Sequence, residues 1–473
     1  MIFLIVLIVY PLTETAFSQS EQWNTTYGES LDDWFGWVEP TEDGGYIAAG
    51  RQKNIISDLR EVGYRTFDVW LVNTDNNGNI RWNKQFGNIS NDWANCVQLT
   101  NDGGFILAGV KDASEGSSTY GIEEADGADA WIIKTNPNGT KLWDKTFGGT
   151  WADSANQIQQ TSDGGYIVVG KYGVGKDNSD AWLIKIDAEG KKIWSNTFSD
   201  NEEANSVQQT SDGGYVFGGY NRKYQETGPT TDAFLIKTDA SGNQIWKKTF
   251  GGKNDDSVQS VRNTSDGGYI LAGYTRSYKD AYNDADAWLI KTDAIGIVQW
   301  IKSFRDLSDE RADSVIEIPD EGYILAGRKE RYGASKTDAW LIRTDLRGNE
   351  KWTKTFSGAE TDWLSSVQID PDGNFILAGG TYSYGNGSAD AWLIKVSGET
   401  ATTMTMTPIP SSTLKEALIN TSPSPIPTKT AAKIDIIGKT EATMTDSSET
   451  PGFEISFAVA VLLSIGILIK REK

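Results

Sequence analysis

Apolar and polar residues alternate in short runs along most of this chain, and each run ends in a turn-forming sequence. Four types of run recur, represented by Ser206–Thr210, Tyr269–Gly273, Asp286–Asp293 and Gln244–Phe250. β-Branched and aromatic residues dominate all four, and the helical period is absent from this region. Ser-Asp-Gly-Gly follows the first type and supplies the positive φ angles that a tight hairpin requires. The pattern therefore predicts antiparallel β-strands joined by short turns.

The four runs return in the same order seven times, at a period of about 50 residues. Each copy contains a version of Asp-Gly-Gly-Tyr, and the copies centre on Asp43, Asp102, Asp163, Asp212, Asp266, Asp320 and Asp372. The last copy stops near Lys395 without its fourth run. The N-terminus supplies that missing run as Gln22-Trp23-Asn24-Thr25-Thr26-Tyr27-Gly28.

A repeat divided between the two ends of a chain is what a closed ring needs. Four strands per repeat, apolar on both faces, suit sheets that pack between two neighbours. We therefore predict an all-β fold: a seven-bladed β-propeller of four-stranded antiparallel blades, the last closed by the N-terminal strand. The alternative is an open β-solenoid, which needs atypical caps at its ends. The complementary ends favour the ring, which leaves no free edge between its first and last repeats.

The turn before the fourth run, and the run itself, contain a recurring tryptophan. In Thr238-Asp239-Ala240-Ser241-Gly242-Asn243-Gln244-Ile245-Trp246 this segment resembles the tryptophan-docking motif of quinoprotein-like propellers. The resemblance implies that one tryptophan per repeat packs between adjacent blades: Trp23, Trp82, Trp143, Trp194, Trp246, Trp300 and Trp352. The quinone-binding and calcium-binding residues of the dehydrogenases in that family have no counterpart that we can locate. The resemblance therefore supports the fold and not the redox chemistry.

Composition narrows the functions. The net charge of −21, from 44 basic and 65 acidic residues, disfavours nucleic acid and anionic lipid as partners. The chain contains no histidine, which excludes Ser-His-Asp and Cys-His catalysis and histidine metal sites. Cys96 is the only cysteine, so no intrachain disulfide forms. Its apolar strand position favours a core residue over a reactive thiol.

Both ends of the chain carry features of export. Ile2 to Tyr10 are apolar and precede a small-residue stretch around Ala16, as in a secretory signal peptide. A second apolar segment, Ile455 to Ile469, ends in a basic cluster. With Pro451-Gly452-Phe453 in front of it, this tail resembles the PGF-type sorting signal of archaeal surface proteins. The resemblance implies that an archaeosortase removes the helix and that lipid anchors the new C-terminus.

These features divide the chain into four parts: a signal peptide at 1–18, the propeller at 19–397, a stalk at 398–450 and the sorting segment at 451–473. The stalk is rich in Thr, Ser and Pro and has too few apolar residues for a core. Six Asn-x-Ser/Thr sequons are compatible with a glycoprotein, at Asn24, Asn88, Asn138, Asn263, Asn386 and Asn420. We therefore predict an exported protein, anchored to the cell surface by its C-terminus.

An acid lies five residues before the central apolar residue of every first strand: Asp33, Asp92, Asp153, Glu202, Asp256, Glu310 and Asp362. In a propeller these seven carboxyl groups form an acidic ring near the mouth of the channel. One interpretation is structural, with each carboxylate accepting backbone N–H bonds or pairing with a lysine. The other is a site for a cation such as calcium or for a cationic ligand. No other cofactor is predicted.

Trp34, Trp93 and Trp363 directly follow an acid of this ring in only three of the seven repeats. The loops between second and third strands also vary and are predicted to open on the same face. Variable loops on a rigid scaffold are where binding is normally placed. Aromatic side chains beside carboxylates suit a carbohydrate or protein surface, although these rings also suit packing within their own loops.

Three functions are compatible with the sequence. The first is a non-enzymatic surface protein that binds an extracellular protein or glycan through its loop-rich face. The second is an exported hydrolase or lyase of polysaccharides that uses carboxylates at the channel mouth. Seven near-equivalent acids do not resemble a catalytic pair in two different environments. The third is a structural component of the cell envelope.

Overall fold

The computed structural model describes residues 20–56, 64–113, 127–175, 178–225, 228–277, 284–305, 308–331, 333–334 and 336–398. These residues form 28 strands and no helix. The predicted signal peptide and sorting segment, and the predicted stalk after Gly398, lie outside the described residues. The first described strand begins at Glu21 and the last ends at Val396.

The strands form seven four-stranded antiparallel sheets, which we call blades 1 to 7. Blade 1 contains β2 (Asp33–Pro40), β3 (Tyr46–Ile56), β4 (Tyr64–Thr74) and β5 (Ile80–Phe86). Blade 2 contains β6 (Asn91–Leu99), β7 (Phe105–Ala113), β8 (Asp129–Thr135) and β9 (Lys141–Phe147). Blade 3 contains β10 (Ser154–Gln160), β11 (Tyr166–Gly173), β12 (Ser179–Ile186) and β13 (Lys192–Phe198).

Blade 4 contains β14 (Glu202–Gln209), β15 (Tyr215–Gln225), β16 (Gly228–Thr238) and β17 (Gln244–Phe250). Blade 5 contains β18 (Asp256–Asn263), β19 (Tyr269–Thr275), β20 (Asp286–Thr292) and β21 (Val298–Phe304). Blade 6 contains β22 (Glu310–Ile318), β23 (Gly322–Glu330), β24 (Thr337–Thr344) and β25 (Glu350–Phe356). Blade 7 contains β26 (Asp362–Ile369), β27 (Phe375–Thr381), β28 (Asp390–Val396) and β1 (Glu21–Tyr27).

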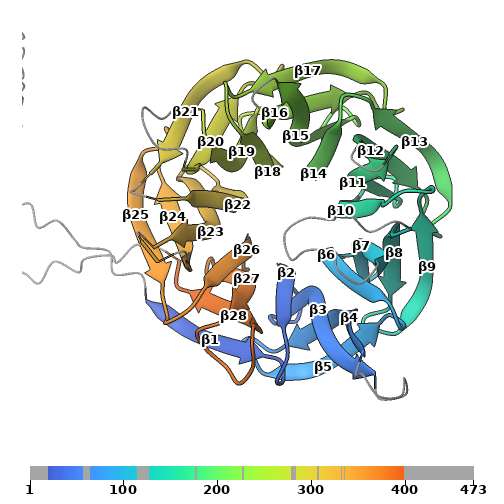
Figure 1. Ribbon diagram of the computed structural model, residues 1–473, viewed down its shortest axis with the longest axis vertical. Helices are drawn as coiled ribbons and strands as arrows, with labels where there is room; N and C mark the ends of the chain where they lie inside the picture. The colour runs from blue at the N-terminus through green and yellow to red at the C-terminus, as the bar shows by residue number, and fades with distance from the viewer. Residues whose placement is uncertain are drawn as a thin grey trace, which may run out of the picture. The chain divides into compact units, whose positions relative to one another are not determined.

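The seven blades stand in a ring with their first strands innermost, so the predicted seven-bladed β-propeller is confirmed (Figure 1). The N-terminal β1 pairs antiparallel with β28, with Thr25 opposite Leu393 and Tyr27 opposite Ala391. This pairing joins the two ends of the propeller within one blade (Figure 1). Blade 7 therefore has its outer strand from one end of the chain and its other three from the other end.

The Asp-Gly-Gly hairpin carries a network that recurs with small changes. In blade 2, Asp102 accepts hydrogen bonds from the Thr100 hydroxyl at 2.6 Å and the Gly104 N–H at 3.0 Å. The amino group of Lys134, buried on β8, lies 2.9 Å from the same carboxylate. Partial burial acts in the opposite direction, but the hydrogen bonds from Thr100 and Lys134 lower the pKa of Asp102 to about 2. The repeated Asp is thus a structural group that connects the hairpin to the third strand.

Two blades show how this network adapts. In blade 1, Asn73 stands in the place of the lysine, and Arg81 from the outer strand pairs with Asp43 instead. In blade 6, Arg343 takes the lysine position and lies 3.0 Å from Glu321. The positive charge beneath the hairpin is therefore kept even where its source changes.

Each recurring tryptophan contacts the next blade around the ring. The ring centroid of Trp82 in blade 1 lies 5.9 Å from that of Phe105 in blade 2. The ring centroid of Trp194 in blade 3 lies 6.0 Å from that of Tyr215 in blade 4. The series continues with Trp143, Trp246, Trp300 and Trp352, which face Tyr166, Tyr269, Tyr323 and Phe375. Trp23 of blade 7 faces Tyr46 of blade 1 at 6.0 Å and completes the ring.

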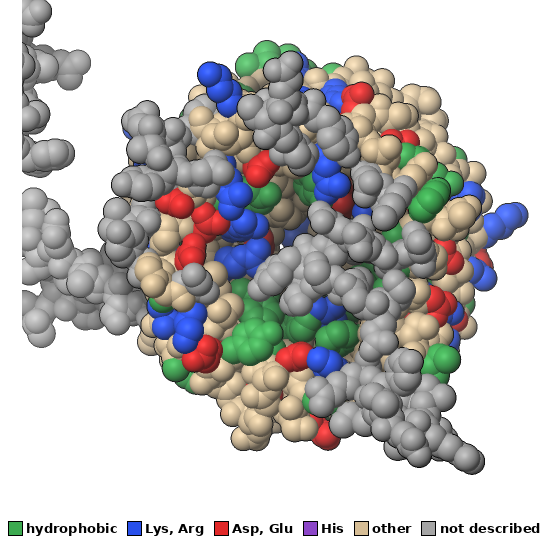
Figure 2. Space-filling model, viewed as in Figure 1, with side chains coloured by type: hydrophobic (Ala, Val, Ile, Leu, Met, Phe, Trp, Pro, Cys, Tyr) green, Lys and Arg blue, Asp and Glu red, His purple; other side chains and the backbone are tan. Residues whose placement is uncertain are grey.

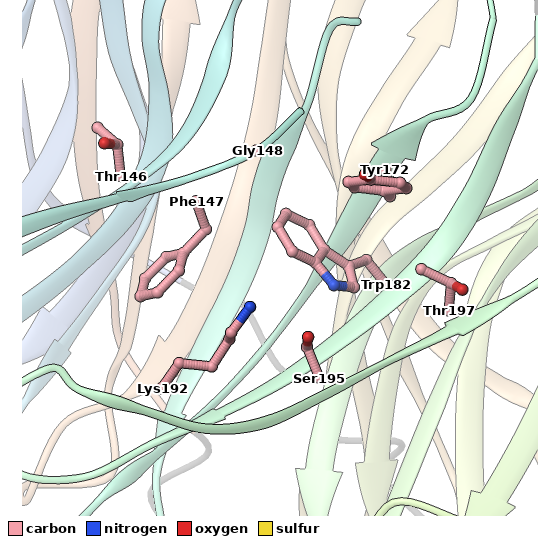
Figure 3. Close-up of a pocket in the computed structure, with 8 residues that line it drawn as sticks. All are labelled: Thr146, Phe147, Gly148, Tyr172, Trp182, Lys192, Ser195 and Thr197. Carbon is pink, nitrogen blue, oxygen red and sulfur yellow. The ribbon is translucent and has the colours of Figure 1, made fainter. Parts of the chain in front are cut away.

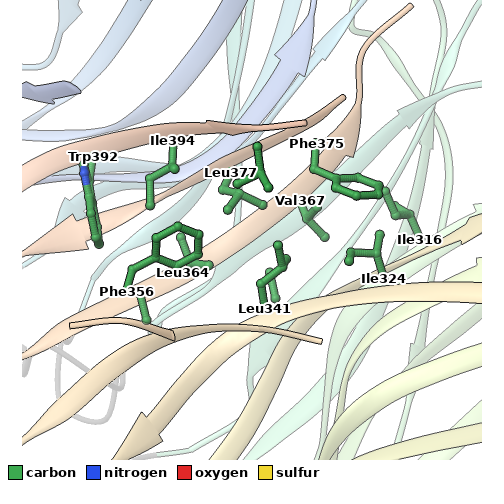
Figure 4. Packing of buried hydrophobic residues seen from close by; sticks show 13 residues of the cluster. Ile316, Ile324, Leu341, Phe356, Leu364, Val367, Phe375, Leu377, Trp392 and Ile394 are labelled. Carbon is green, nitrogen blue, oxygen red and sulfur yellow. The ribbon is translucent and has the colours of Figure 1, made fainter. Parts of the chain in front are cut away.

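A glycine in each outer turn makes room for these rings. Gly139 has a φ of 72°, and a Cβ there would lie 2.5 Å from the Trp82 ring. Only glycine satisfies both the backbone angle and the close approach. The apolar core itself lies between blades, as the cluster of blades 6 and 7 shows (Figure 4). There Leu341 of β24 packs with Leu364 and Val367 of β26.

Ring closure predicts that Trp23 stabilises the propeller as much as an equivalent tryptophan inside the ring. We expect Trp23→Ala to lower the free energy of unfolding by about 2 kcal/mol, because a half-buried ring and its contact with Tyr46 are lost. Trp194→Ala is the matched variant, since Trp194 has the same centroid distance to Tyr215. Urea unfolding followed by tryptophan fluorescence measures both. A much smaller effect of Trp23→Ala would contradict a ring that β1 closes.

Candidate functional site

The seven blades differ most clearly at one cross-strand pair beside the channel. The first member is the residue after the recurring acid of the inner strand, and the second follows the repeated Ala-Gly of the next strand. We call these pairs the mouth ring: Trp34–Arg51, Trp93–Val110, Ser154–Lys171, Glu203–Tyr220, Ser257–Tyr274, Arg311–Arg328 and Trp363–Gly380. Neighbouring core positions keep the same character in every blade, so variation here is not required by the fold.

One side of the mouth ring is aromatic and comes from blades 7, 1 and 2. Trp34 and Trp363 meet edge to face, with ring centroids 6.1 Å apart. The Arg51 guanidinium lies 3.3 Å from the Trp34 centroid and 5.5 Å from the Trp93 centroid. The structure thus links Trp34 and Trp93 through an arginine that the sequence analysis did not single out, and it packs Trp363 against Trp34. Arg51 is only 8% exposed, whereas Trp34 and Trp93 are half-buried.

The other side of the mouth ring is polar and comes from blades 4 to 6. The Tyr220 hydroxyl donates to Glu203 at 2.8 Å. The Arg311 guanidinium lies 4.5 Å from the centroid of Tyr274. Arg311 and Arg328 stand opposite each other on β22 and β23, an arrangement that like charges disfavour.

The molecular surface shows the same division. Figure 2 shows hydrophobic side chains on one side of the central hollow, where blades 7 and 1 meet, and basic side chains over β22 and β23. A cavity of about 310 Å³ lined by Arg311 and Arg328 adjoins the basic side. Asp309 balances part of this charge, at 2.9 Å from Arg276 and 3.7 Å from Arg311. The mouth therefore combines stacking surfaces with paired hydrogen-bonding groups.

The seven predicted acids lie at the start of the inner strands, and all are at most 1% exposed. Their oxygens face the crossover loops. Asp153 accepts N–H bonds from Gly149 at 2.6 Å and Gly173 at 2.9 Å, and Asp92 accepts them from Asn88 and Asp112. Asp33 likewise caps Glu29 and Lys53, while Asp256 and Asp362 bind Gly252 and Gly358. Glu202 pairs with Lys247. These contacts are those of the structural interpretation.

These acids do not converge on one point. Within the described residues, no three Asp, Glu or Cys side chains are grouped as metal ligands. Five of them instead have an acidic neighbour on a third strand, as Asp129 is for Asp153 and Asp390 for Asp33. Burial raises the pKa of Asp33, Asp92 and Asp153 to about 6, although their N–H donors act in the opposite direction. The seven acids are thus buried carboxyl groups, three of which change protonation near pH 6, and they do not form an exposed charged surface.

Sequence reasoning missed Arg51, Tyr220, Tyr274, Arg311 and Arg328. Their signal was present, because they occupy one column of the aligned repeats that changes from blade to blade. In the loop between β27 and β28, Tyr384 is 43% exposed, and its ring centroid lies 5.5 Å from that of Trp392 in the same blade. Most of the other variable-loop tyrosines fall outside the described residues or side chains.

A groove of about 480 Å³ also opens at the rim, between the outer strands of blades 2 and 3 (Figure 3). Trp182 and Tyr172, with ring centroids 5.0 Å apart, form one side, and Phe147 faces it with Lys192 nearby (Figure 3). Tyr384 and Trp392 form a similar pair in blade 7. The aromatic pair that lines this groove therefore occurs in more than one blade, whereas the residues of the mouth ring change from blade to blade.

No protein-family model matches the chain, and no curated protein sequence matches it. Among solved structures it resembles a PL25 ulvan lyase bound to -[GlcA(1-4)Rha3S]-, with 8% identity over 78% of this chain and 95% of that chain and a TM-score of 0.49. It also resembles the Neurospora crassa Pan2 WD40 domain, with 10% identity, coverage of 81% and 96%, and a TM-score of 0.46. It also resembles the propeller of the Pyrococcus furiosus Trilobed protease, with 10% identity over 80% of this chain and 95% of that chain and a TM-score of 0.42. At these values the neighbours do not indicate a ligand or an activity.

In the described part of the chain, no apolar helix has the length to cross a membrane. Because the structural neighbours indicate no ligand or activity, the function is argued from the site itself.

The raised pKa values predict that the propeller is more stable in mild acid than at neutral pH. The folded protein binds protons at Asp33, Asp92 and Asp153 with a pKa of about 6, against 3.8 for the model value. The stability linked to these protons is fully present below the unfolded pKa and is lost as the pH rises through about 6. The hairpin aspartates, whose pKa is lowered to about 2, oppose this only in stronger acid.

We therefore expect the melting temperature to fall between pH 5 and pH 7.5, as measured by circular dichroism. The net charge also changes over this range, so the series is repeated in 0.5 M NaCl, which screens long-range repulsion more than buried desolvation. A melting temperature that rises from pH 5 to pH 7.5 in both salt conditions would contradict the assignment.

Proposed function

We propose that the protein is a non-enzymatic surface protein that binds a glycan at the mouth ring. The observation that supports this is the cluster in which Arg51 contacts Trp34 and Trp93 and Trp363 packs on Trp34, at positions that vary among otherwise similar blades. Features common to all blades belong to the scaffold, so a shared aromatic site from three blades needs another explanation. Ligand binding is the most direct one.

The chemistry of the mouth favours a glycan over a protein. Sugar rings present C–H faces that pack on aromatic rings, and hydroxyl groups that pair with planar carboxylate and guanidinium groups. The aromatic and polar sides of the mouth ring supply both within one hollow (Figure 2). A stable protein partner would need about 1,200 to 2,000 Å² of total buried surface, more than a hollow of this kind alone supplies. An extracellular protein is therefore the alternative partner.

Removal of single tryptophans tests the proposal. We expect Trp34→Ala and Trp93→Ala each to weaken glycan binding by about tenfold, because each removes one stacking surface. Binding is measured by calorimetry with glycans first found on an array, using the full chain. Leu142→Ala is the control, since Leu142 is 56% exposed on the outer strand β9, far from the mouth ring in its blade.

The melting temperatures of the variants separate lost binding from lost folding, which matters most for Trp363→Ala because Trp363 is only 8% exposed. Unchanged affinity in folded Trp34→Ala and Trp93→Ala variants would reject the mouth ring as the site. If the protein bound an envelope protein but no glycan, the mouth ring would remain the proposed site and the proposed ligand would change from a glycan to a protein.

A polysaccharide hydrolase or lyase is the second candidate. The hydrogen bond from the Tyr220 hydroxyl to Glu203, with Arg222 and Tyr274 close by, favours it because it places a proton donor and acceptor at the mouth. The buried acids at the strand starts are less suited to this role, since their oxygens already accept N–H bonds. New reducing ends or unsaturated products from a bound glycan would establish this candidate. Ordered self-assembly without any ligand would instead indicate the third candidate, a structural envelope component.

We further propose that the chain is exported and anchored to an archaeal cell surface through its C-terminus. The signal-like 1–18, the stalk-like 398–450 and the Pro451-Gly452-Phe453 motif support this. We expect the mature protein in the native cell to lack residues 1–18 and the apolar segment after the motif. Mass spectrometry of the terminal peptides tests both, and intact ends on a protein recovered from the cell interior would contradict export.

A further inference from the structure

A second ring of side chains lies deeper in the channel, at the residue after the buried Val or Ile of each inner strand. We call it the glutamine ring, and its members are Glu39, Gln98, Gln159, Gln208, Arg262, Ile316 and Gln368. It lies five residues along β2 from Trp34, or roughly 15 Å from the mouth ring. Glutamine is the common residue, so Glu39 and Arg262 are departures that introduce opposite charges.

A cavity of about 130 Å³ occurs at this level and is lined by residues of blades 1 to 5 and blade 7. We call it the channel chamber. Both charged members of the glutamine ring line it, together with Trp37 and several glutamines. A chamber on which so many blades converge differs from the surface grooves, each of which lies between neighbouring strands.

The glutamines of the channel chamber present hydrogen-bond donors. The side-chain oxygen of Gln157 accepts the Val207 N–H at 2.6 Å, and that of Gln98 accepts the Gln160 N–H at 2.6 Å. Gln159 binds the Gln209 N–H in the same way. These contacts fix which end of each amide is oxygen. The three NH₂ groups make no hydrogen bond within the described residues and remain available for an acceptor.

The charged side chains extend this donor set. No described residue forms a hydrogen bond or an ion pair within 4.0 Å with the Arg262 guanidinium, which lies 5.3 Å from the Trp37 ring centroid. One oxygen of Glu39 accepts from Trp37 at 2.8 Å and from Gln368 at 3.1 Å. A guanidinium and three amide NH₂ groups around one small cavity are complementary to an oxyanion.

We propose that the channel chamber binds a small carboxylate anion, held by Arg262 and by the NH₂ groups of Gln98, Gln157 and Gln159. A planar carboxylate matches the two parallel N–H donors of a guanidinium. The volume limits the ligand, because a cavity of about 150 Å³ accommodates a molecule of the size of benzene. Acetate, glycolate and lactate fit this limit. The site is separate from the mouth ring, so this proposal is independent of glycan binding.

The titratable groups facing the chamber are Glu39, Arg262 and Cys96. Burial raises the pKa of Glu39 to about 7, although Trp37 and Arg262 act in the opposite direction. Burial also raises the pKa of Cys96 to about 12, so the thiol stays neutral. Arg262 stays positively charged at neutral pH. A bound anion disfavours ionised Glu39, so we expect carboxylate binding to weaken as the pH rises from 6 to 8.

The test is titration of the full chain with acetate, glycolate and lactate, followed by calorimetry and by saturation-transfer NMR. We expect Arg262→Gln to weaken binding by about tenfold or more, and Arg262→Lys to weaken it less. We expect Glu39→Gln to keep binding and to abolish its decline between pH 6 and 8. Both Gln variants restore the residue that is usual in this ring, which protects folding. Arg347→Gln, on an exposed turn, is the control.

Three results would overturn the proposal. One is that none of the three carboxylates binds at about 10 mM, a weak limit for a charged ligand of this size. Another is equal affinity in wild type and in a folded Arg262→Gln variant. Phosphate binding more tightly than every carboxylate would also reject the proposed class, since the fork of Arg262 would then not select a planar anion.

Discussion

The contact between a tryptophan of one blade and the aromatic residue of the next is the interaction on which this propeller depends. It repeats seven times, and the seventh instance, Trp23 of β1 with Tyr46 of β3, packs blade 7 against blade 1. In six of the seven contacts the tryptophan ring lies against a glycine with positive φ in the opposing turn, as Gly139 shows against Trp82. A single blade exposes both apolar faces, so no blade is stable alone and the ring must close to bury them all.

That closure also determines the electrostatics. The crossover loops between blades leave N–H groups that need acceptors, and the buried acids such as Asp153 supply them. Because Asp153 is dehydrated and lies beside the carboxyl group of Asp129, its pKa rises instead of falling. The hairpin aspartates show the reverse, because the amino group of a buried lysine such as Lys134 stabilises the ionised form of Asp102. The pKa of an aspartate in this protein is thus raised or lowered according to its position in the repeat.

The repeat made the fold predictable, and the same repeat limited what could be said about the site. Strand order, blade number and the pairing of β1 with β28 follow from a pattern that is present seven times. The seven acids were also found from their recurrence, but recurrence left open whether they accept backbone N–H bonds in the loops or form a cation site. Trp34, Trp93 and Trp363 were identified as exceptions, whereas Arg51 was not. Its place above Trp34 depends on the cross-strand register of β2 and β3, which a repeat alone does not specify.

The distribution of charge inside the ring connects these observations to function. A scaffold of near-identical blades tends to give a ring of channel side chains the same residue in most blades, as the four glutamines of the glutamine ring illustrate. Uniformity serves the fold, whereas recognition of a ligand without sevenfold symmetry requires that it be broken. The chain departs from uniformity at two depths, with aromatic and basic sides at the mouth and with Glu39 and Arg262 below. At both depths arginine is introduced into a strongly acidic protein, and like charges at Arg311 and Arg328 are tolerated side by side. The like-charged pair works against stability, and the fold of the blades itself requires none of these departures.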